Sequence, residues 1–216
     1  MFWRGALQQY IDHPERFEAL TDPNSGSCVI YHDSKVVLIT DGFPKAVEHI
    51  LILPRNPLLS KSHPTTALSD NVKRKMEPYI EIAIDYIVEQ FTKKYIILDK
   101  NLKEDFKKKL IQVGVHRVPS MNNLHIHVIT KDFYSARLKN KKHYNSFNTN
   151  FFVKWHDLPL QNKPLDNKLV EKEYLRDHDL ICCYCGMNFT NKFAKLKEHL
   201  KVEFNERFES NTMVTL

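Results

Sequence analysis

The segment Asn123-Leu-His-Ile-His-Val128 alternates polar and apolar residues with a period of two. This is the period of a β-strand with one buried face, and it places Asn123, His125 and His127 on the opposite face from three aliphatic side chains. Two imidazoles at successive positions on one strand face lie ~7 Å apart, so a single phosphate can contact both. The chain is therefore expected to fold around a sheet that packs on one face and carries a histidine site on the other.

Polar groups just before this strand extend the predicted site. Gly114-Val-His116 offers a third imidazole on the preceding strand, and Ser120 lies in the turn between the two strands. A turn hydroxyl and its neighbouring backbone N–H groups suit phosphate oxygens. A metal site or a solvated polar face is the alternative interpretation, although a metal would need a third ligand and Asn123 is a poor one.

The rest of the pattern predicts an α+β fold. Short β-rich segments occur at 28–31, 36–39, 49–53, 113–118 and 124–130. A long helix is predicted from Ser69, with an apolar face from Met76 to Phe91, and a second, basic helix at 101–112. Residues 2–20 are expected to form one or two short helices, whereas residues 131–150 are polar and show little periodicity.

Length and charge limit the class of protein. The 216 residues allow a domain at 1–158 and a smaller module at 166–216, joined by a linker. No apolar run approaches the ~18–20 residues that span a bilayer, and the first residues lack the pattern of a secretory signal. A reducing compartment is expected, and the net charge of +6 suits a polyanionic partner without identifying one.

Three of the four cysteines lie within four residues, which indicates metal binding in a reducing compartment. Cys182-x2-Cys185 has zinc-knuckle spacing, and a helix predicted at 192–204 places His199 and Glu203 on one face. Two thiolates, one imidazole and one carboxylate form an acceptable tetrahedral set for Zn²⁺. The alternative is a surface helix beside an incidental Cys-x2-Cys. Cys183 is not expected to be a ligand.

Several stretches resemble the histidine triad (HIT) superfamily, and specifically its aprataxin branch. Residues 114–128 resemble the active-site segment, and 41–46 with 49–54 resemble the strand pair that binds the nucleotide. Residues 139–149 are similar to the basic loop of that branch, and the tail resembles the zinc finger of its fungal members, in which Glu is the fourth ligand. The resemblance implies a HIT fold, an antiparallel sheet with flanking helices, followed by a zinc-finger module. The forkhead-associated domain of animal members is expected to be absent.

The resemblance also implies an activity, the removal of AMP from adenylated 5′ ends of DNA left by abortive ligation. His125 would attack the α-phosphate and form an adenylyl-histidine, which water would then release as AMP. The remaining roles would be phosphate stabilisation by His127, leaving-group protonation by His116, phosphate contacts by Ser120 and Lys45, ribose contacts by Asp41, and a less defined place in the pocket for His49. No catalytic metal is expected, and zinc would be structural.

DNA contacts are predicted on both sides of this site. The basic cluster comprises Lys139, Lys141, Lys142 and His143, and an N-terminal helix carrying Phe2, Trp3 and Leu7 would stack on the terminal base pair. For Phe2 and Trp3, ordinary core packing is the alternative. The expected partner is nicked or double-stranded DNA with an adenylated 5′ end, bound by a monomer in the nucleus, with the cytoplasm as a further location.

The first position of the triad pattern departs from the family, because Asn123 stands there in place of His. Asn hydrogen-bonds but does not titrate, so we expect this change to affect pocket geometry or rate rather than reaction class. Two other functions stay open on the sequence. One is a hydrolase of small adenylyl or guanylyl nucleotides, and the other is a non-catalytic zinc-finger adaptor that binds DNA ends.

Overall fold

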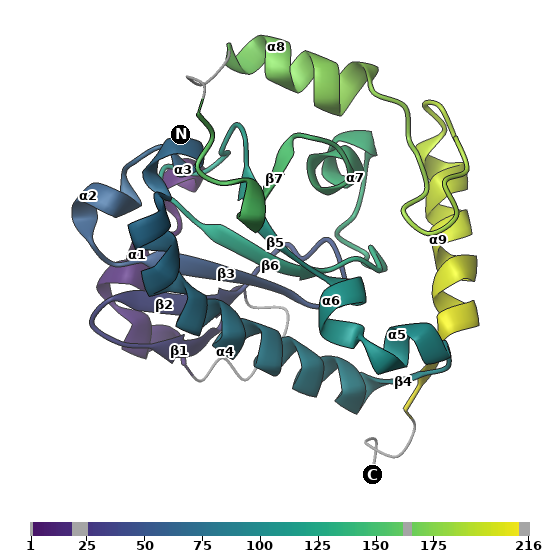
Figure 1. The fold of residues 1–216 in the computed structure, drawn as a ribbon, viewed down its shortest axis with the longest axis horizontal. Coiled ribbons are helices and arrows are strands. Elements are labelled where there is room, and N and C mark those ends of the chain that lie inside the picture. The colour runs from purple at the N-terminus through teal and green to yellow at the C-terminus, as the bar shows by residue number, and fades with distance from the viewer. Residues whose placement is uncertain (1, 19–25, 162–165, 212–216) are drawn as a thin grey trace.

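A computed structural model describes residues 2–18, 26–161 and 166–211 of the chain (Figure 1). Its centre is a six-stranded antiparallel sheet in the order β1-β2-β3-β6-β5-β7. The strands are β1 (Val29–His32), β2 (Val36–Thr40), β3 (His49–Pro54), β5 (Ile111–His116), β6 (Ile126–Thr130) and β7 (Phe152–Lys154). The α+β class with an antiparallel sheet flanked by helices is therefore confirmed.

One face of the sheet packs against the long helix α4 (Asp70–Lys94), which crosses it along the lower edge of Figure 1. Buried residues from Met76 to Phe91 pack against alternate residues of β2, β3 and β6. Ile126 and Val128 belong to this core, as the alternation predicted. His127 therefore points to the other face of the sheet.

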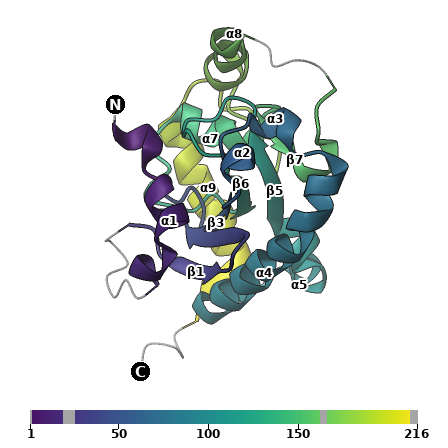
Figure 2. The same ribbon diagram turned by 90° about the vertical axis from the view of Figure 1, so that its left-hand side faces the viewer.

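The opposite face is covered by two different groups of elements (Figure 2). The N-terminal helices η1 (Phe2–Gly5), α1 (Gln8–Asp12) and η2 (Pro14–Phe17) lie over β1 to β3, where Leu7, Tyr10 and Ile11 are buried against Leu51 and its neighbours. Helix α7 (Lys141–Asn148) lies over β5 to β7. The face of β6 that carries His127 lies where these two groups of helices meet.

The remaining helices connect the sheet strands and lead to the tail. They are α2 (Pro57–Ser60), α3 (Pro64–Ala67), α5 (Lys100–Glu104), α6 (Phe106–Leu110), η3 (Trp155–Asp157), α8 (Asn167–Glu171) and the π-helix η4 (Lys172–Asp177). The tail continues through a turn at Cys182–Cys185 into α9 (Phe193–Arg207), which is yellow in Figure 1. Strand β8 (Phe208–Ser210) then pairs with β4 (Tyr95–Ile97), so the end of the tail returns to the main body.

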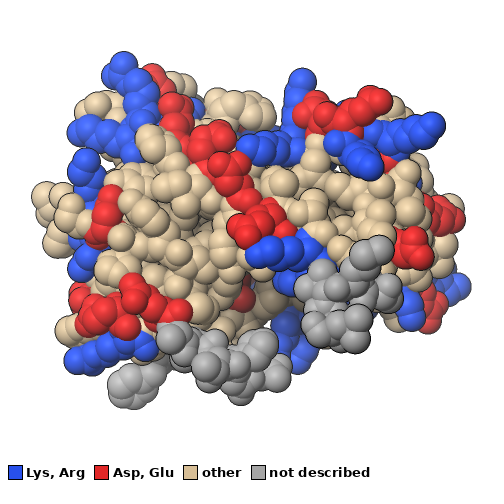
Figure 3. All heavy atoms as spheres, turned by 90° about the horizontal axis from the view of Figure 1, so that it is seen from below, with Lys and Arg blue, Asp and Glu red and all other residues tan. Residues whose placement is uncertain are grey.

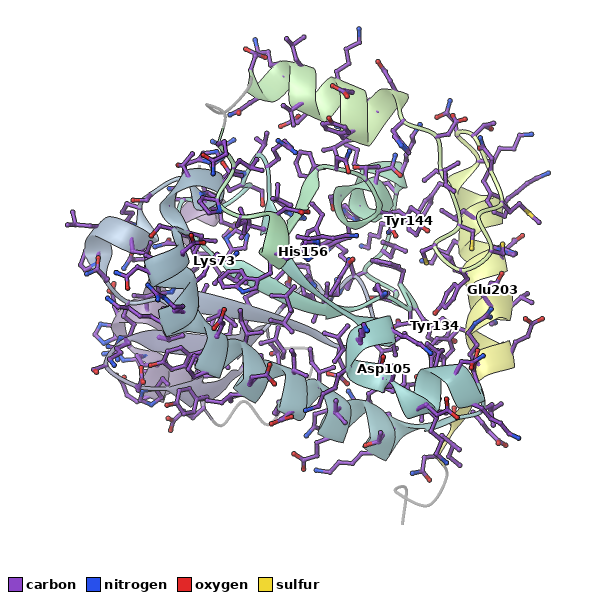
Figure 4. All side chains as sticks on the ribbon, viewed as in Figure 1. Lys73, Asp105, Tyr134, Tyr144, His156 and Glu203 are labelled. Carbon is purple, nitrogen blue, oxygen red and sulfur yellow. The ribbon has the colours of Figure 1, made fainter. Side chains whose placement is uncertain are left out.

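The tail shares its hydrophobic core with the main body. Leu180, Leu196 and Leu200 belong to one buried cluster with Ile129 of β6 and Phe147 of α7. Tyr144 of α7, labelled in Figure 4, donates its hydroxyl hydrogen to Ile181 O at 2.9 Å. Helix α7 therefore contacts the tail on one side and the sheet on the other.

Three predictions about local structure were wrong. The basic helix expected at 101–112 is two short helices, separated at Asp105, whose backbone (φ −141°, ψ 52°) is not helical. It also ends earlier than expected, because Ile111 and Gln112 already belong to β5. The polar segment 131–150 and the basic loop expected at 139–149 contain helix α7, which Asn140 caps by accepting a hydrogen bond from His143 N at 3.0 Å. The strand expected at 113–118 ends at His116, and the strand expected at 124–130 begins only at Ile126.

The excess of positive charge is not spread as one patch over the face below α4. Seen from that side, Lys and Arg alternate with Asp and Glu across the surface (Figure 3). A polyanionic partner is therefore better sought on the opposite side, where the histidines lie. Separately, none of the helices that the structure describes is long and apolar enough to cross a membrane.

Candidate active site and zinc centre

Four imidazoles converge on the sheet face opposite α4. His127 of β6 faces Gly114 of β5 in the strand pairing, and the missing Cβ at Gly114 matters because a methyl group there would collide with Val153 O and the Phe152 ring. The His127 ring centroid lies 4.4 Å from that of His116 and 4.8 Å from that of His125. His125 and His127 are each no more than 5% exposed.

The orientation of His125 is fixed by its own backbone. Its Nδ1 lies 2.8 Å from Asn123 O. Because a carbonyl oxygen only accepts, Nδ1 carries the hydrogen and Nε2 keeps its lone pair. Burial also lowers the pKa of His125, so the ring is neutral near pH 7. A neutral imidazole with a free Nε2 lone pair is the form required of a nucleophile.

A chain of polar contacts leads away from His127. His49 Nε2 lies 2.9 Å from His127 Nδ1, and His49 Nδ1 lies 3.2 Å from Asp41 Oδ2. Burial lowers the pKa of His49 to about 4, and burial together with neighbouring imidazoles lowers the pKa values of His116 and His127. Although Asp41, His49 and His127 lie close enough to be considered for a metal, we interpret them as a chain of polar contacts, because His49 and His127 already hydrogen-bond to each other.

A pocket of about 770 Å³ opens above these imidazoles. Its walls come from the N-terminal segment, the Asp41–Lys45 turn, the 118–121 turn, α7 and α8. The predicted site residues that line it are Leu7, Asp41, Lys45, His49, His116, Ser120, His125, His127, Lys142 and His143. The pocket therefore brings together residues that the sequence placed in five separate segments.

Some predicted residues lie elsewhere. Asn123 is buried outside the pocket, where its Nδ2 donates to Gln8 Oε1 at 3.0 Å and to Ser60 Oγ at 2.9 Å. Lys139 is exposed beyond the pocket lining, and Lys141 points to the tail, where its Nζ donates to Asn191. The side chains of Phe2 and Trp3 lie outside the described residues.

Other pocket residues were not predicted. Helix α7 presents Ser146 and Phe147 to the pocket beside the predicted Lys142 and His143, at spacings that place all four on one helical face. Ser27 also lines the pocket and accepts a hydrogen bond from Gly42 N at 3.0 Å. Asn140 is a residue type preferred at helix N-caps and could have indicated the start of α7. Nothing in the sequence around Ser27 distinguished it from an ordinary turn serine.

The predicted zinc ligands meet in the tail. One ligand atom each from Cys182, Cys185, His199 and Glu203 lies within 4.8 Å of the others. Gly186, at a φ of 74°, closes the turn after Cys185. Cys183 is not in the group, and its thiol lies 3.6 Å from Lys131 O. Two thiolates, one imidazole and one carboxylate at this spacing fit Zn²⁺.

Comparisons with known proteins agree with both sites. Residues 22–134 match the HIT domain family, and residues 148–206 match the C2HE/C2H2/C2HC zinc-binding finger family. An aprataxin-like protein of Saccharomyces cerevisiae is 49% identical over 97% of this chain and 99% of its own length. The chain belongs to the aprataxin family.

Solved structures of the aprataxin family share the fold. The crystal structure of the aprataxin ortholog Hnt3 from Schizosaccharomyces pombe is 35% identical, with a TM-score of 0.73 over 93% of this chain and 92% of its own. A second Hnt3 structure, solved in complex with DNA, is 34% identical, with a TM-score of 0.65 over 94% of this chain and 96% of its own. The HIT fold and zinc-binding finger expected from the sequence are therefore confirmed.

Proposed function

We propose that this member of the aprataxin family is a DNA 5′-adenylate hydrolase that releases AMP from abortive ligation intermediates and restores a 5′-phosphate for single-strand break repair. The observation that carries the proposal is the meeting of His116, His125 and His127 at the base of one pocket. Related structures of Hnt3 in complex with DNA, and with DNA and guanosine, support a nucleic-acid substrate.

The pocket supplies contacts for an adenylate group. Asp41 accepts hydrogen bonds from the ribose hydroxyls, and Lys45 and Ser120 contact phosphate oxygens. Lys45 is suited to this because its charge is partly removed from water, and burial lowers its pKa. An incoming phosphate offsets that desolvation, so the lysine favours an anion at this point.

His125 carries the bond-making step. Its Nε2 attacks the α-phosphorus of the adenylate, a P–N bond forms, and the P–O bond to the 5′-phosphate of DNA breaks. Water then attacks the adenylyl-histidine, releasing AMP and the neutral imidazole. His127, 4.8 Å away between ring centroids, stabilises the charge on the phosphate oxygens.

His116 assists the leaving group. Its Nε2 is buried without a hydrogen-bond partner, which leaves it available to the substrate. Burial and the nearby imidazoles lower its pKa, so it is neutral in the free pocket. The charge of the bound phosphates opposes both effects and raises that pKa, which lets His116 share a proton with the departing 5′-phosphate. Positioning and charge stabilisation carry the reaction in this proposal, without a catalytic metal.

The tail grips the DNA next to the reactive end. In this proposal a structural Zn²⁺ is held by Cys182, Cys185, His199 and Glu203. The catalytic domain comprises residues 1–158, and the DNA-binding module comprises residues 166–216. Helix α7 links the two parts, since Lys142 and His143 line the pocket while Tyr144 and Asn145 hydrogen-bond to the tail. The partner is nicked or double-stranded DNA, bound by a monomer in the nucleus. The protein contacts the DNA phosphate backbone, so little sequence preference is expected.

The test is single-turnover release of AMP from adenylated nicked DNA. Wild-type protein should release AMP, and His125→Ala should lose at least ~10³-fold in rate, the scale of removing a covalent nucleophile. His156→Ala is the matched control, because His156 is exposed outside the pocket and should leave the rate unchanged. Equal rates for wild type and His125→Ala would refute the mechanism. Turnover of small adenylyl conjugates but not of adenylated DNA would favour the small-nucleotide hydrolase.

A further inference from the structure

The four residues of the zinc-ligand group carry an unusual total charge. Two thiolates, one neutral imidazole and one carboxylate bring three negative charges to a divalent ion, so the loaded group has a net charge of −1. A Cys₂His₂ set would be neutral. Glu203 lies on α9, as Figure 4 shows, and its side chain is buried. A buried net charge is costly unless an opposite charge accompanies it.

Arg207 supplies that opposite charge from the next turn of α9. Its Nη1 lies 2.5 Å from Glu203 Oε2 and also donates to Glu203 O at 2.8 Å. The other carboxylate oxygen, Oε1, lies 2.9 Å from His199 Nε2, on the side of the ligand group. The two oxygens of Glu203 therefore have different partners, one toward the ligands and one toward the guanidinium.

The same guanidinium also contacts the cysteine turn. It lies over the ring of Tyr184, 4.6 Å from the ring centroid, and Tyr184 stands between Cys182 and Cys185. The backbone of Arg207 is held in turn by the main body, because Arg207 O accepts from Leu98 N at 2.8 Å. Arg207 thus contacts both the cysteine turn and the ligand helix α9, and its backbone is hydrogen-bonded to Leu98 of the main body.

We propose that Arg207 is a positioning residue for the zinc centre. It holds Glu203 Oε2 so that Oε1 alone faces the metal, and it neutralises the extra negative charge of a Cys₂HisGlu set. Contacts of this kind around a metal orient the ligands and change metal affinity ~10–100-fold when removed. The role depends on the carboxylate, since a neutral fourth ligand would need neither the charge nor the orientation. It is independent of the reaction proposed above.

The test compares Zn²⁺ affinity in two backgrounds, by competition of the full-length protein with a chelator. Arg207→Met should lower the affinity ~10–100-fold when Glu203 is present. In a Glu203→His background, which makes a Cys₂His₂ set, the same change should cost less than about threefold, because the loaded ligand set then has no net charge for the guanidinium to neutralise. Equal losses in both backgrounds, or no loss with Glu203 present, would overturn the proposal.

Two further measurements keep the result interpretable if Glu203→His folds poorly. Arg207→Lys retains the charge without the planar fork and ring contact, so it should recover part of the affinity that Arg207→Met loses. With Co²⁺ in place of zinc, the visible ligand-field bands should shift in Arg207→Met because the carboxylate rotates. An unchanged Co²⁺ spectrum would reduce Arg207 to a helix-stabilising ion pair, and Arg207→Lys as weak as Arg207→Met would refute the part of the proposal that assigns charge neutralisation to Arg207.

Discussion

The side chains of His49 and His127 are joined by a contact of 2.9 Å between His49 Nε2 and His127 Nδ1. The sheet produces this contact, because His49 pairs with Ile129 and Leu51 pairs with His127, which makes the two histidines diagonal neighbours on one face. Lys45 N donates to His49 Nδ1 at 3.4 Å, so that nitrogen accepts and the hydrogen of His49 lies on Nε2. His49 Nε2 then donates to His127 Nδ1, so the hydrogen of His127 lies on its Nε2, where it can stabilise a phosphate oxygen.

Acid should destabilise the protein through His49. Its pKa in the folded state is about 4, lowered from 6.5 by burial. The unfolded chain therefore binds more protons between these values, so the free energy of unfolding should be fully retained above pH 6.5 and fall as the pH drops toward 4. Urea unfolding at a series of pH values measures this. His49→Gln should be less sensitive to pH in the same window, and an unchanged pH dependence would contradict the assignment.

Much of the fold was predictable because its sequence signals are local. The alternation of Ile126, His127 and Val128 and the apolar face of α4 are set by side chains a few residues apart, and both appear in the structure as expected. The zinc-ligand group was predictable for the same reason, since Cys182 and Cys185 share one turn and His199 and Glu203 share one helix face.

The features that were missed depend on contacts distant in sequence. Helix α7 has few apolar residues, and its stability comes from packing Tyr144 and Phe147 into a core made by the tail and the sheet. Asn123 was predicted to bind substrate because strand periodicity placed it with His125. Strand β6 begins only at Ile126, so Asn123 lies outside it, and its amide instead donates to Gln8, 115 residues away in sequence.

Asn123 should therefore contribute to stability. Asn123→Leu removes the donor that serves Gln8 Oε1 and the buried Ser60 Oγ, so the free energy of unfolding should fall by about 1–3 kcal/mol. Denaturant unfolding measures the change. Asn122→Leu is the matched control, because the adjacent side chain is exposed and its substitution should cost less than ~0.5 kcal/mol. Equal effects of the two substitutions would exclude this role for the buried amide.

Lys142 should contact the DNA backbone. It is exposed at the rim of the pocket, so Lys142→Ala should weaken binding of every DNA sequence similarly and reduce the slope of log Kd against log salt by about 1. Fluorescence anisotropy with nicked DNA over a salt series measures the slope. Lys107→Ala is the control, since Lys107 lies on α6 and pairs with Asp85 at 2.5 Å. A slope reduced equally by both variants would indicate a diffuse charge effect.

Neighbouring cysteines should differ in their effect on zinc. Cys182→Ser removes a thiolate from the ligand group, so zinc content measured by atomic emission should fall from about one equivalent to well below it. Cys183→Ser should retain zinc, because Cys183 is not among the four residues whose ligand atoms converge, and its thiol lies 3.6 Å from Lys131 O. Since helix α7 packs against this tail, zinc loss in Cys182→Ser should also slow AMP release from adenylated DNA. Zinc loss in Cys183→Ser, or full retention in Cys182→Ser, would show that the metal has a different ligand set.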